Sequence, residues 1–349
     1  MHNPKNILIT GGKGFIGTNF INYILLKYKN QKIINLDKLT YAANINIIKN
    51  KKYKFVKGDI SNKKLVYEIL LKYNIDTIVN FAAETHVDNS IKTPRLFINS
   101  NISGVFNLIE AANQYYKTNY KKLKNNFRFH QISTDEVYGS LKLKEKPFTE
   151  KSSYKPNSPY SASKAGADHI IRSYYKTYNL PITISTCSNN YGPFQNSEKL
   201  IPKIIYNCIN RKEIPIYGNG LNIRDWIYVD DHCDAIYKIL KYGKIGETYN
   251  VGSNNELKNI EIVKLICKII NSKYDFRNDN LLNLITFVKD RPGHDFRYSL
   301  NSNKIKRKLK WRPEISFDKG ISKTINWYVE NQRYFSKISK NLFSKRLGK

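Results

Sequence analysis

The chain has 349 residues, of which 59 are Lys or Arg and 28 are Asp or Glu, giving a formal net charge of +31. This length is ample for a large core and favours two domains or one large one. No apolar run is long enough to span a bilayer, and the first residues lack the layout of a signal peptide. The scattered cysteines form no C-x-x-C pair, which argues against a disulfide framework or a metal site and predicts a cytoplasmic protein.

The basic excess allows two interpretations. Nucleic-acid-binding proteins use lysines to neutralise phosphates and concentrate them on one face or arm. Here the charge is spread along the whole chain, with only local clusters such as Lys304–Lys310. We therefore expect no nucleic-acid partner and no membrane partner, and a positive field that favours an anionic substrate.

The stretch Asn6–Phe20 predicts a phosphate-binding strand, turn and helix. Asn6–Thr10 is an apolar run typical of a buried parallel strand, and a helical pattern follows the turn. Gly11, Gly14 and Gly17 would permit the tight turn, the approach of a pyrophosphate and close packing of the helix. The pyrophosphate would then rest on the free N–H groups of the helix N-terminus.

A second predicted strand, Lys32–Leu36, ends at Asp37, about twenty residues after the last glycine. A carboxylate at this place accepts hydrogen bonds from the adenosine ribose of a bound dinucleotide. The glycine spacing differs from the usual G-x-G-x-x-G, so an ordinary glycine-rich turn with a surface aspartate is the alternative. The order of strand, turn, helix, strand and acid favours the dinucleotide site.

The next two strands bring polar and small residues to the same edge. Lys54–Lys57 leads into Asp59, and Thr77–Phe81 leads into Ala82 and Ala83. Asp59 would face the ligand, cap the following helix, or do both. The helices predicted here are Leu65–Tyr73 and the amphipathic Pro94–Gln114.

The alternation continues with a strand at Phe127–Ile132, a helix at Pro159–Tyr178 and a strand at Thr183–Cys187. It predicts an α/β fold with a doubly wound parallel Rossmann sheet. Proline-bearing loops after Asn190 indicate a smaller C-terminal α/β domain, which the family resemblance described below implies to be the substrate domain. The predicted NAD-binding domain is 1–190 with a late return strand within about 228–254, and the predicted substrate domain is 191–227 with 255–349. Further predicted elements are a strand at Glu247–Val251, helices at Ile260–Ile270 and Gly320–Glu330, and a disordered or frayed tail at Tyr334–Lys349.

Tyr160 and Lys164 are the first candidate catalytic residues. They lie four positions apart on one helix, so both side chains project from the same face. A neighbouring ammonium favours the phenolate, so we expect a lowered pKa for Tyr160 that makes it a usable base. Thr134, at the end of the fifth strand, would donate to the same substrate oxygen. A surface Tyr–Lys pair is the alternative, but the preceding nucleotide turn favours catalysis.

Asp135 and Glu136 follow Thr134 directly. Adjacent carboxylates at a strand end are costly unless they are solvated or used. They would form a solvated loop, the N-terminus of a helical turn, or an acid and a base acting on one substrate. Hydride transfer alone needs only the tyrosine, so a second acid–base pair implies removal of a proton from carbon and departure of water.

The whole chain resembles the dTDP-glucose 4,6-dehydratase family of the extended short-chain dehydrogenases/reductases. The resemblance runs from about Lys5 to Tyr328, and the Asp135–Glu136 pair is its most specific part, because related sugar-nucleotide epimerases lack it. The chain departs from the family at Asn89, where Arg is common, in a short loop after Gly139 and in its basic tail. The motifs that carry the resemblance are GGKGFIG, DKLTYA, AAETHVD, STDEVYG, PYSASKA, CSNNYGP, EKLIP, IPIYGNG, RDWIYVDDH, ETYNVG and DRPGHDFRY.

The resemblance implies an internal redox cycle with tightly held NAD. Tyr160 takes the proton of the glucose 4-hydroxyl, Glu136 removes the carbon-5 proton, and Asp135 protonates the departing 6-hydroxyl. Hydride returns to carbon 6, which gives a 4-keto-6-deoxy sugar for deoxysugar synthesis, such as that of rhamnose. It also implies a homodimer in which the helices Pro94–Gln114 and Pro159–Tyr178 form a four-helix bundle with their copies.

By motif match, the resemblance also assigns the binding residues. Those expected at the cofactor are Gly11, Gly14, Phe15, Ile16, Gly17, Asp37, Lys38, Thr40, Asp59, Ile60, Phe81, Ala82, Ala83, Ser100, Tyr160, Lys164 and Asn189. Those expected at the substrate are Thr85, His86, Thr134, Asn190, Glu198, Lys199, Leu200, Pro215, Tyr217, Arg224, Asn259, Arg291 and His294. Arg224 and Arg291 suit a diphosphate because a guanidinium forks phosphate oxygens. His294 would instead be a satisfied loop histidine in the alternative interpretation.

Three other functions stay open from the sequence. A UDP-glucose 4,6-dehydratase would use the same chemistry on another base. A sugar-nucleotide 4-epimerase would not need Asp135 and Glu136. A protein that only senses NAD or binds nucleic acid would not need the base formed by Tyr160 and Lys164.

Overall fold

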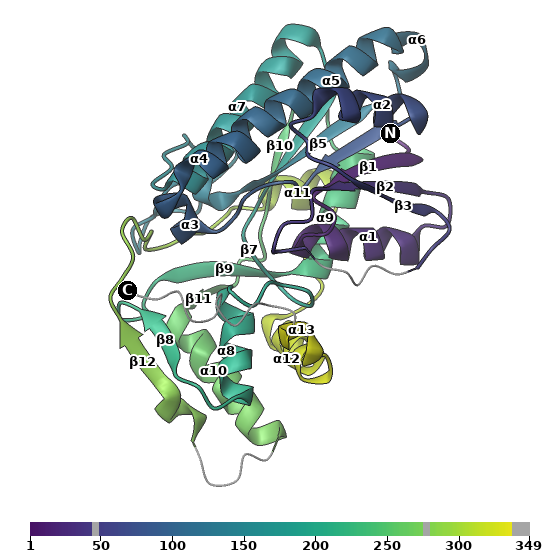
Figure 1. Cartoon of the computed structure of the whole chain (residues 1–349). Helices are drawn as coiled ribbons and strands as arrows, with labels where there is room; N and C mark the ends of the chain where they lie inside the picture. Colours follow the sequence, from purple (N-terminus) through teal and green to yellow (C-terminus); the bar gives the residue numbers. More distant parts are fainter. Residues whose placement is uncertain (44–48, 275–279, 337–349) are drawn as a thin grey trace.

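The computed structural model describes residues 1–43, 49–274 and 280–336 (Figure 1). Its largest element is a seven-stranded parallel sheet in the order β10-β6-β5-β4-β1-β2-β3. The predicted doubly wound parallel sheet is thereby confirmed. Its strands are β1 (Asn6–Thr10), β2 (Lys32–Asp37), β3 (Tyr53–Lys57), β4 (Thr77–Asn80), β5 (Arg128–Thr134), β6 (Ile182–Cys187) and β10 (Thr248–Val251).

Helices cover both faces of this sheet, which is why its inner strands read as continuous apolar runs. Leu8 and Ile78 pack into the core on the side of α2, α5 and α7, whereas Ile7 and Ile9 pack on the side of α1 and α9. Figure 1 shows these two helical layers above and below the sheet. The helices are α1 (Phe15–Lys27), α2 (Lys63–Lys72), α5 (Gly104–Thr118), α7 (Pro159–Tyr178) and α9 (Val229–Tyr242).

The part below the large sheet in Figure 1 has a core of its own, which includes Ile205, Trp226 and Ile266. Two small sheets and three helices surround this core, while β10 returns to the large sheet beside β6. The division into two domains remains our proposal. The elements of this part are β7 (Asn189–Tyr191), α8 (Leu200–Ile209), β8 (Ile214–Tyr217), β9 (Ile223–Tyr228), β11 (Glu256–Lys258), α10 (Asn259–Lys273), β12 (Ile285–Val288) and α12 (Phe317–Glu330).

The predicted helix Pro94–Gln114 is not one continuous α-helix. It consists of α4 (Pro94–Phe97), a π-helical segment η1 (Ile98–Ser103) and α5, which ends at Thr118. The wider turn directs Asn101 inward, where its side-chain oxygen accepts from the Glu84 N–H at 2.9 Å and its nitrogen donates to Ser163 Oγ at 2.8 Å. The apolar periodicity of the segment carries no trace of this change, because π-turns insert into an otherwise helical pattern.

Most other predicted bounds lie close to the observed ones, and β1 and α7 match theirs. Among the described residues, none of the helices combines the length and apolar character that a bilayer crossing requires. The predicted tail begins within a short helix, α13 (Arg333–Ser336), and the rest of it, from position 337, lies outside the described residues. The remaining short elements are α3 (Val87–Lys92), α6 (Tyr120–Leu123), η2 (Asp135–Tyr138), η3 (Leu281–Leu284), α11 (Asn303–Leu309) and α13 (Arg333–Ser336).

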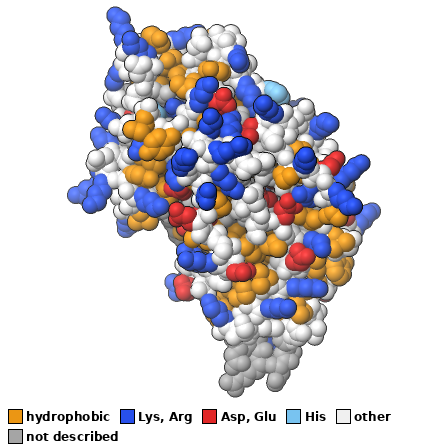
Figure 2. All heavy atoms as spheres, turned by 180° about the vertical axis from the view of Figure 1, so that it is seen from behind, with side chains coloured by type: hydrophobic (Ala, Val, Ile, Leu, Met, Phe, Trp, Pro, Cys, Tyr) orange, Lys and Arg blue, Asp and Glu red, His pale blue; other side chains and the backbone are white. Residues whose placement is uncertain are grey.

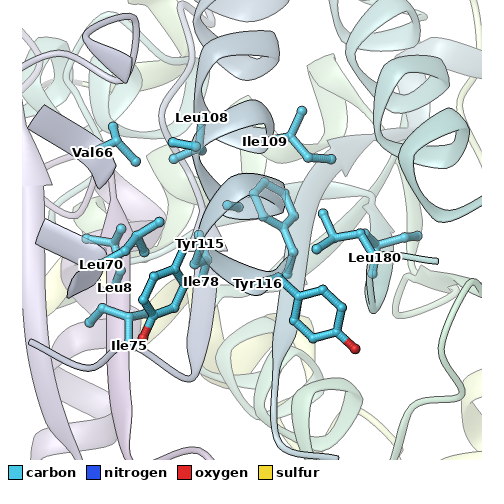
Figure 3. Packing of buried hydrophobic residues seen from close by; sticks show 14 of the residues in the cluster. Leu8, Val66, Leu70, Ile75, Ile78, Leu108, Ile109, Tyr115, Tyr116 and Leu180 are labelled. Carbon is cyan, nitrogen blue, oxygen red and sulfur yellow. The ribbon is translucent and has the colours of Figure 1, made fainter. Parts of the chain in front are cut away.

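Two neighbouring leucines of α2 test this packing. Leu70 is fully buried beside Leu8 and Val66 (Figure 3), whereas Leu71 is 44% exposed. We expect Leu70→Ala to lower the free energy of unfolding by about 2–5 kcal/mol, because it leaves a cavity in the core. Leu71→Ala, the control, should change it by less than about 0.5 kcal/mol. Urea denaturation measures both; equal losses would contradict the observed orientation of α2.

Candidate active site

A cavity of about 310 Å³ lies along the carboxyl edge of the large sheet. Its walls come from the residues that follow strands β1 to β6 and from the first turns of α1 and α7. Ligands of doubly wound sheets bind at this edge. Every residue predicted for the cofactor and every predicted catalytic residue lines the cavity, so the structure brings these two sets together.

The steric surroundings differ among the three glycines of the first turn, Gly11, Gly14 and Gly17. Gly11 has a φ of +67°, and a Cβ there would lie 2.6 Å from Ala82 Cα. A Cβ on Gly17 would lie 2.6 Å from the Gly11 carbonyl oxygen. A Cβ on Gly14 would meet only that same oxygen, at 3.2 Å. Gly14 is the N-cap of α1 and has no side chain to bond the helix N–H groups, which leaves this end open to an anion.

Asp37 closes the second wall of the cavity. Its carboxylate accepts hydrogen bonds from the backbone N–H groups of Lys13 at 2.9 Å and Leu39 at 2.8 Å. These bonds fix the carboxylate and leave lone pairs for a ribose hydroxyl. Lys38 reaches across the cavity, donating to Ser100 Oγ at 2.9 Å and lying 3.8 Å from Asp59 Oδ2.

Helix α7 carries Tyr160 and Lys164 into the cavity from its first turns. A capping box formed by Ser158 and Ser161 fixes where the helix begins. Both Tyr160 and Lys164 are buried, and Lys164 Nζ donates to the Ile132 carbonyl oxygen at 2.7 Å. The pair is therefore part of the sheet edge rather than a surface Tyr–Lys pair.

The predicted direction of the Tyr160 pKa is wrong. Burial raises the pKa of Tyr160 well above its ordinary value, and the charge of Glu136 raises it further. A hydrogen bond from Thr134 acts in the opposite direction. Burial also lowers the pKa of Lys164. The sequence shows the spacing of Tyr160 and Lys164, but it does not show that both groups are desolvated.

Asp135 and Glu136 do not form a solvated loop, because they begin the short 3₁₀-helix η2 against the cavity. Asp135 is only 2% exposed, and its Oδ2 has no hydrogen-bond partner within the part of the chain that the structure describes. Burial raises the pKa of Asp135 well above its usual range, and Glu136 adds to this shift. A carboxyl group held protonated in this way can donate a proton.

Glu136 experiences a different field from its neighbour. Burial raises the pKa of Glu136, but the positive charges of Arg291, Arg224 and Lys199 oppose the shift. These cations come from the other part of the chain and favour the ionised carboxylate. The two adjacent carboxyl groups are thus placed in environments that suit an acid and a base, respectively.

A second cavity of about 230 Å³ adjoins the first, with Glu136 and Asn190 on the shared wall. All the residues predicted for substrate line this second cavity except Thr134, which lines the first. The wall includes β8 and the start of α8, both from the lower part of the chain in Figure 1.

The guanidinium of Arg224 is less available than predicted. It donates to the backbone oxygens of Ile223 at 2.8 Å, Asp295 at 2.8 Å and Phe296 at 3.2 Å, and it lies over the Tyr298 ring. The remaining N–H groups are those that could meet a phosphate in the cavity. Arg224 is therefore held rigidly, which suits an arginine that binds a ligand without moving.

Predicted substrate residues also join the two parts of the chain. Lys199 Nζ donates to the Thr85 carbonyl oxygen at 3.0 Å, and His86 Nε2 lies 3.5 Å from Glu198 Oε2. Asp88 contributes similarly, since it accepts from Tyr217 OH at 3.1 Å and lies 3.4 Å from Arg291 Nη1. The second cavity is thus closed on one side by direct contacts between its own lining residues.

Both interpretations of His294 describe part of what is observed. Its Nδ1 lies 2.6 Å from Asp290 Oδ1, so the ring has a partner within its own loop. It also lines the second cavity, next to the Tyr217 ring. Burial and the charge of Arg291 lower the pKa of His294 to about 4, so the ring is neutral at physiological pH.

The lining residues that sequence reasoning missed include Asp88, Cys187, Gln195 and Tyr298. Three of them stand inside the motifs AAETHVD, CSNNYGP and DRPGHDFRY, so a signal was present. Gln195 lies in a loop with no such signal.

Comparison with known proteins identifies the family. A family model described as GDP-mannose 4,6 dehydratase matches residues 8–324. dTDP-glucose 4,6-dehydratase from Haemophilus influenzae is 47% identical over 333 residues, covering 93% of this chain and 98% of that protein. The chain belongs to the dTDP-glucose 4,6-dehydratase family. The enzyme of that name from Escherichia coli is 45% identical and covers 98% of this chain and 99% of its own length.

Solved structures of the family share the whole fold. The Bacillus anthracis dTDP-glucose 4,6-dehydratase, in complex with NAD, has a TM-score of 0.84 at 43% identity, covering 96% of this chain and 99% of its own. The Streptomyces venezuelae enzyme, also with NAD bound, has a TM-score of 0.86 at 39% identity, covering 94% and 98%. A Thermotoga maritima UDP-glucose 4-epimerase, at 24% identity and a TM-score of 0.82, shares the fold alone.

Proposed function

We propose that this chain catalyses the NAD-dependent dehydration of dTDP-glucose to dTDP-4-keto-6-deoxyglucose. The observation that carries this proposal is the pair of buried Asp135 and half-buried Glu136, which follows Thr134 and shares one cavity with Tyr160 and Lys164. Epimerisation at carbon 4 needs one acid–base group beside the cofactor. A second pair with separated environments is required only when a carbon proton and a hydroxyl group must both leave.

The residues of the first cavity fit NAD. The open N-terminus of α1 at Gly14 suits the pyrophosphate, and the fixed carboxylate of Asp37 suits the adenosine ribose. When bound, NAD supplies the hydride acceptor that oxidises the sugar and later returns the hydride. We assign Tyr160 and Lys164 to the nicotinamide end, because they lie at the opposite wall near β5 and β6.

Tyr160 and Thr134 hold the 4-hydroxyl group of the sugar, and Tyr160 accepts its proton. The phenolate needed for this step is disfavoured by burial, so it depends on compensating charge and hydrogen bonds. Lys164, with its ammonium fixed by the Ile132 carbonyl, supplies positive charge next to the phenolate. Thr134 supplies the hydrogen bond.

Dehydration follows at the carboxyl pair. With carbon 4 as a ketone, the proton on carbon 5 becomes acidic, and Glu136 removes it as the base. Asp135 gives its proton to the departing 6-hydroxyl, which leaves as water. The protons balance, because one carboxyl group gains the proton that the sugar loses and the other supplies the proton that the leaving group takes.

The second cavity is our proposed site for the nucleotide and diphosphate of the substrate. Arg224 and Arg291 are its strongest cations for a diphosphate, and both also stabilise ionised Glu136. One set of charges would thus hold the substrate and prepare the base. The other residues that we propose to contact substrate here are Thr85, His86, Asn190, Glu198, Lys199, Leu200, Pro215, Tyr217, Asn259 and His294.

Nucleic-acid binding has less support as a function of this chain. Figure 2 shows Lys and Arg side chains scattered over one face of the molecule, with Asp and Glu between them. A nucleic-acid surface typically gathers its cations into one stripe or patch.

The four cysteines are buried free thiols, which suits a reducing compartment, so we place the reaction in the cytoplasm.

We further propose a homodimer built on the helices α5 and α7. These helices pack against each other, and the neighbouring surface exposes Leu96 at 56%, Ile98 at 44% and Phe106 at 45%. Apolar side chains grouped on one helical face typically mark an interface. A second copy related by a two-fold axis would cover them as a four-helix bundle.

The two half-reactions give the central test. Asp135→Asn and Glu136→Gln should keep sugar oxidation, because Tyr160, Lys164 and Thr134 remain. Both should lose dehydration by about a hundred- to ten-thousand-fold, the usual cost of a lost general acid or base. Mixing each variant with dTDP-glucose should therefore let the absorbance of reduced nicotinamide accumulate. Tyr160→Phe should show no such accumulation, because the first proton transfer is blocked.

Turnover of both carboxyl variants at the wild-type rate would overturn the dehydratase assignment. Product formation is followed by the alkali-induced absorbance of the 4-keto sugar. Comparing UDP-glucose with dTDP-glucose in this assay determines which nucleobase the enzyme prefers. Faster turnover of UDP-glucose than of dTDP-glucose would favour the uridine alternative.

Gly14 tests the cofactor site. Gly14→Arg should abolish NAD binding, because the side chain would occupy the space of the pyrophosphate. Gly14→Ala is the matched control and should bind NAD more weakly than wild type but measurably, since its Cβ meets only the Gly11 oxygen. The NAD content of the purified proteins, with circular dichroism as the folding check, measures both. Full NAD content in the Arg variant would show that the site is misassigned.

Substitution of two exposed phenylalanines tests the proposed interface: Phe106 lies within it and Phe287 lies on the other part of the chain. Phe106→Glu on α5 should shift the protein to monomers, because two charges would be buried at the two-fold axis. Phe287→Glu, at a residue of β12 that is 60% exposed, is the control and should leave the dimer intact. Light scattering at micromolar concentration gives the mass of each; a monomeric wild type would rule the dimer out.

A further inference from the structure

Consecutive residues at the end of β5 are tied to helix α7. The Ile132 carbonyl oxygen accepts from Lys164 Nζ at 2.7 Å, and Ser133 Oγ donates to Asp168 Oδ2 at 2.6 Å. The next residue, Thr134, begins the catalytic segment. Asp168 therefore fixes the strand end immediately before the groups that act on the substrate.

Asp168 lies on the same face of α7 as the catalytic pair. It follows Tyr160 and Lys164 at intervals of four residues, so the three side chains form one row along the helix. Asp168 is fully buried, and its Oδ1 has no hydrogen-bond partner among the described residues. A buried carboxylate with an unsatisfied oxygen is costly unless neighbouring cations compensate it.

We propose that Asp168 is a positioning residue whose negative charge keeps Lys164 an ammonium in the water-excluded site, while its bond to Ser133 fixes the end of β5. This inference rests on the proposed function, because it assigns a purpose to the charge of Lys164. Asp168 does not line the cavity and acts only through Lys164 and Ser133.

A purely structural role leaves the charge of Asp168 unexplained. Its Oδ2 accepts from two neutral hydroxyl donors, Ser133 Oγ and Tyr154 OH, the latter at 2.9 Å. An asparagine amide oxygen could accept both bonds without the cost of burying a charge. The feature that only a carboxylate provides is a negative charge, and the cations that favour this charge are Lys164 and Arg172. Of these two cations, Lys164 lines the cavity and Arg172 does not.

The surrounding charges leave Asp168 as the main support of the ammonium. Burial lowers the pKa of Lys164, and among its neighbours Asp168 opposes that shift most, followed by Cys187 on β6. Burial raises the pKa of Asp168, and the hydrogen bond from Ser133 together with the charges of Lys164 and Arg172 opposes that shift and favours the ionised form. The titratable groups that face this row are Tyr160, Lys164 and Arg172 on α7, Asp135, Glu136 and Tyr138 on η2, Cys187 on β6 and Tyr154 in the preceding loop.

The consequence is a shift in the pH dependence of sugar oxidation. Without the negative charge at position 168, the pKa of Lys164 falls further, so its proton is lost at lower pH. Since the proposed reaction needs the ammonium, activity declines as pH rises through that pKa. The alkaline limb of kcat/KM should therefore move to lower pH in Asp168→Asn.

The test is the pH profile of kcat/KM for dTDP-glucose, followed by the alkali-induced absorbance of the 4-keto sugar that forms. We expect the alkaline limb of Asp168→Asn to move down by about 1 pH unit or more, the usual effect of one nearby charge. Tyr154→Phe and Ser133→Ala each remove one neutral donor and keep the carboxylate. Their rates can fall, but their alkaline limbs should stay at the wild-type pH.

An unmoved limb in Asp168→Asn would overturn the inference, as would an equal shift in Tyr154→Phe. If the asparagine variant does not fold, Asp168→Ser, which is smaller and uncharged, makes the same comparison. A wild-type protein that forms no 4-keto sugar from dTDP-glucose would instead overturn the proposed function. The two failures are therefore distinguishable.

Discussion

The parallel order of the large sheet is the constraint on which the site depends. The carboxyl ends of parallel strands lie at one edge of the sheet, so residues that are far apart in the sequence lie close together there. Gly11 after β1, Asp37 at the end of β2 and Thr134 at the end of β5 share one cavity for this reason. The helix that follows β5 then returns Tyr160 to the same edge. The arrangement of the site residues thus depends first on the order of the strands, which sets where each side chain begins.

Charge burial is the second constraint, and it links the two parts of the chain. Asp135 and Glu136 are adjacent, and Arg224 opposes the raised pKa of both. Arg291 and Lys199 are further opposing charges at Glu136, and Arg291 is the largest of them. These cations distinguish two carboxyl groups that the sequence presents as equivalent. A protein that lacked the second part would hold both carboxyl groups without this distinction. The acid and the base become different only when the two parts are joined.

The features predictable from sequence were those that local pattern determines. The bounds of β1 and α7, the turn at Gly11 and the pairing of Tyr160 with Lys164 depend on neighbouring residues, and they were predicted well. The π-helical segment at Asn101 and the raised pKa of Tyr160 were not, because each results from what surrounds the chain in space. Beyond Asn190 the short strands pair with distant partners, so local periodicity gives little information about them.

Asp88 connects the contact between the two parts of the chain with the pKa of Glu136. From the start of α3 it contacts Arg291 and Tyr217, which belong to the other part of the chain. Arg291 is also the cation that most strongly opposes the raised pKa of Glu136. The contact that draws the two parts together therefore fixes the charge that favours an ionised base. In the proposed function, the substrate diphosphate and the Asp88 carboxylate compete for the same guanidinium, so substrate binding either shares Arg291 with Asp88 or displaces Asp88. The proposed base would then be coupled to the substrate through a residue that takes no part in proton transfer.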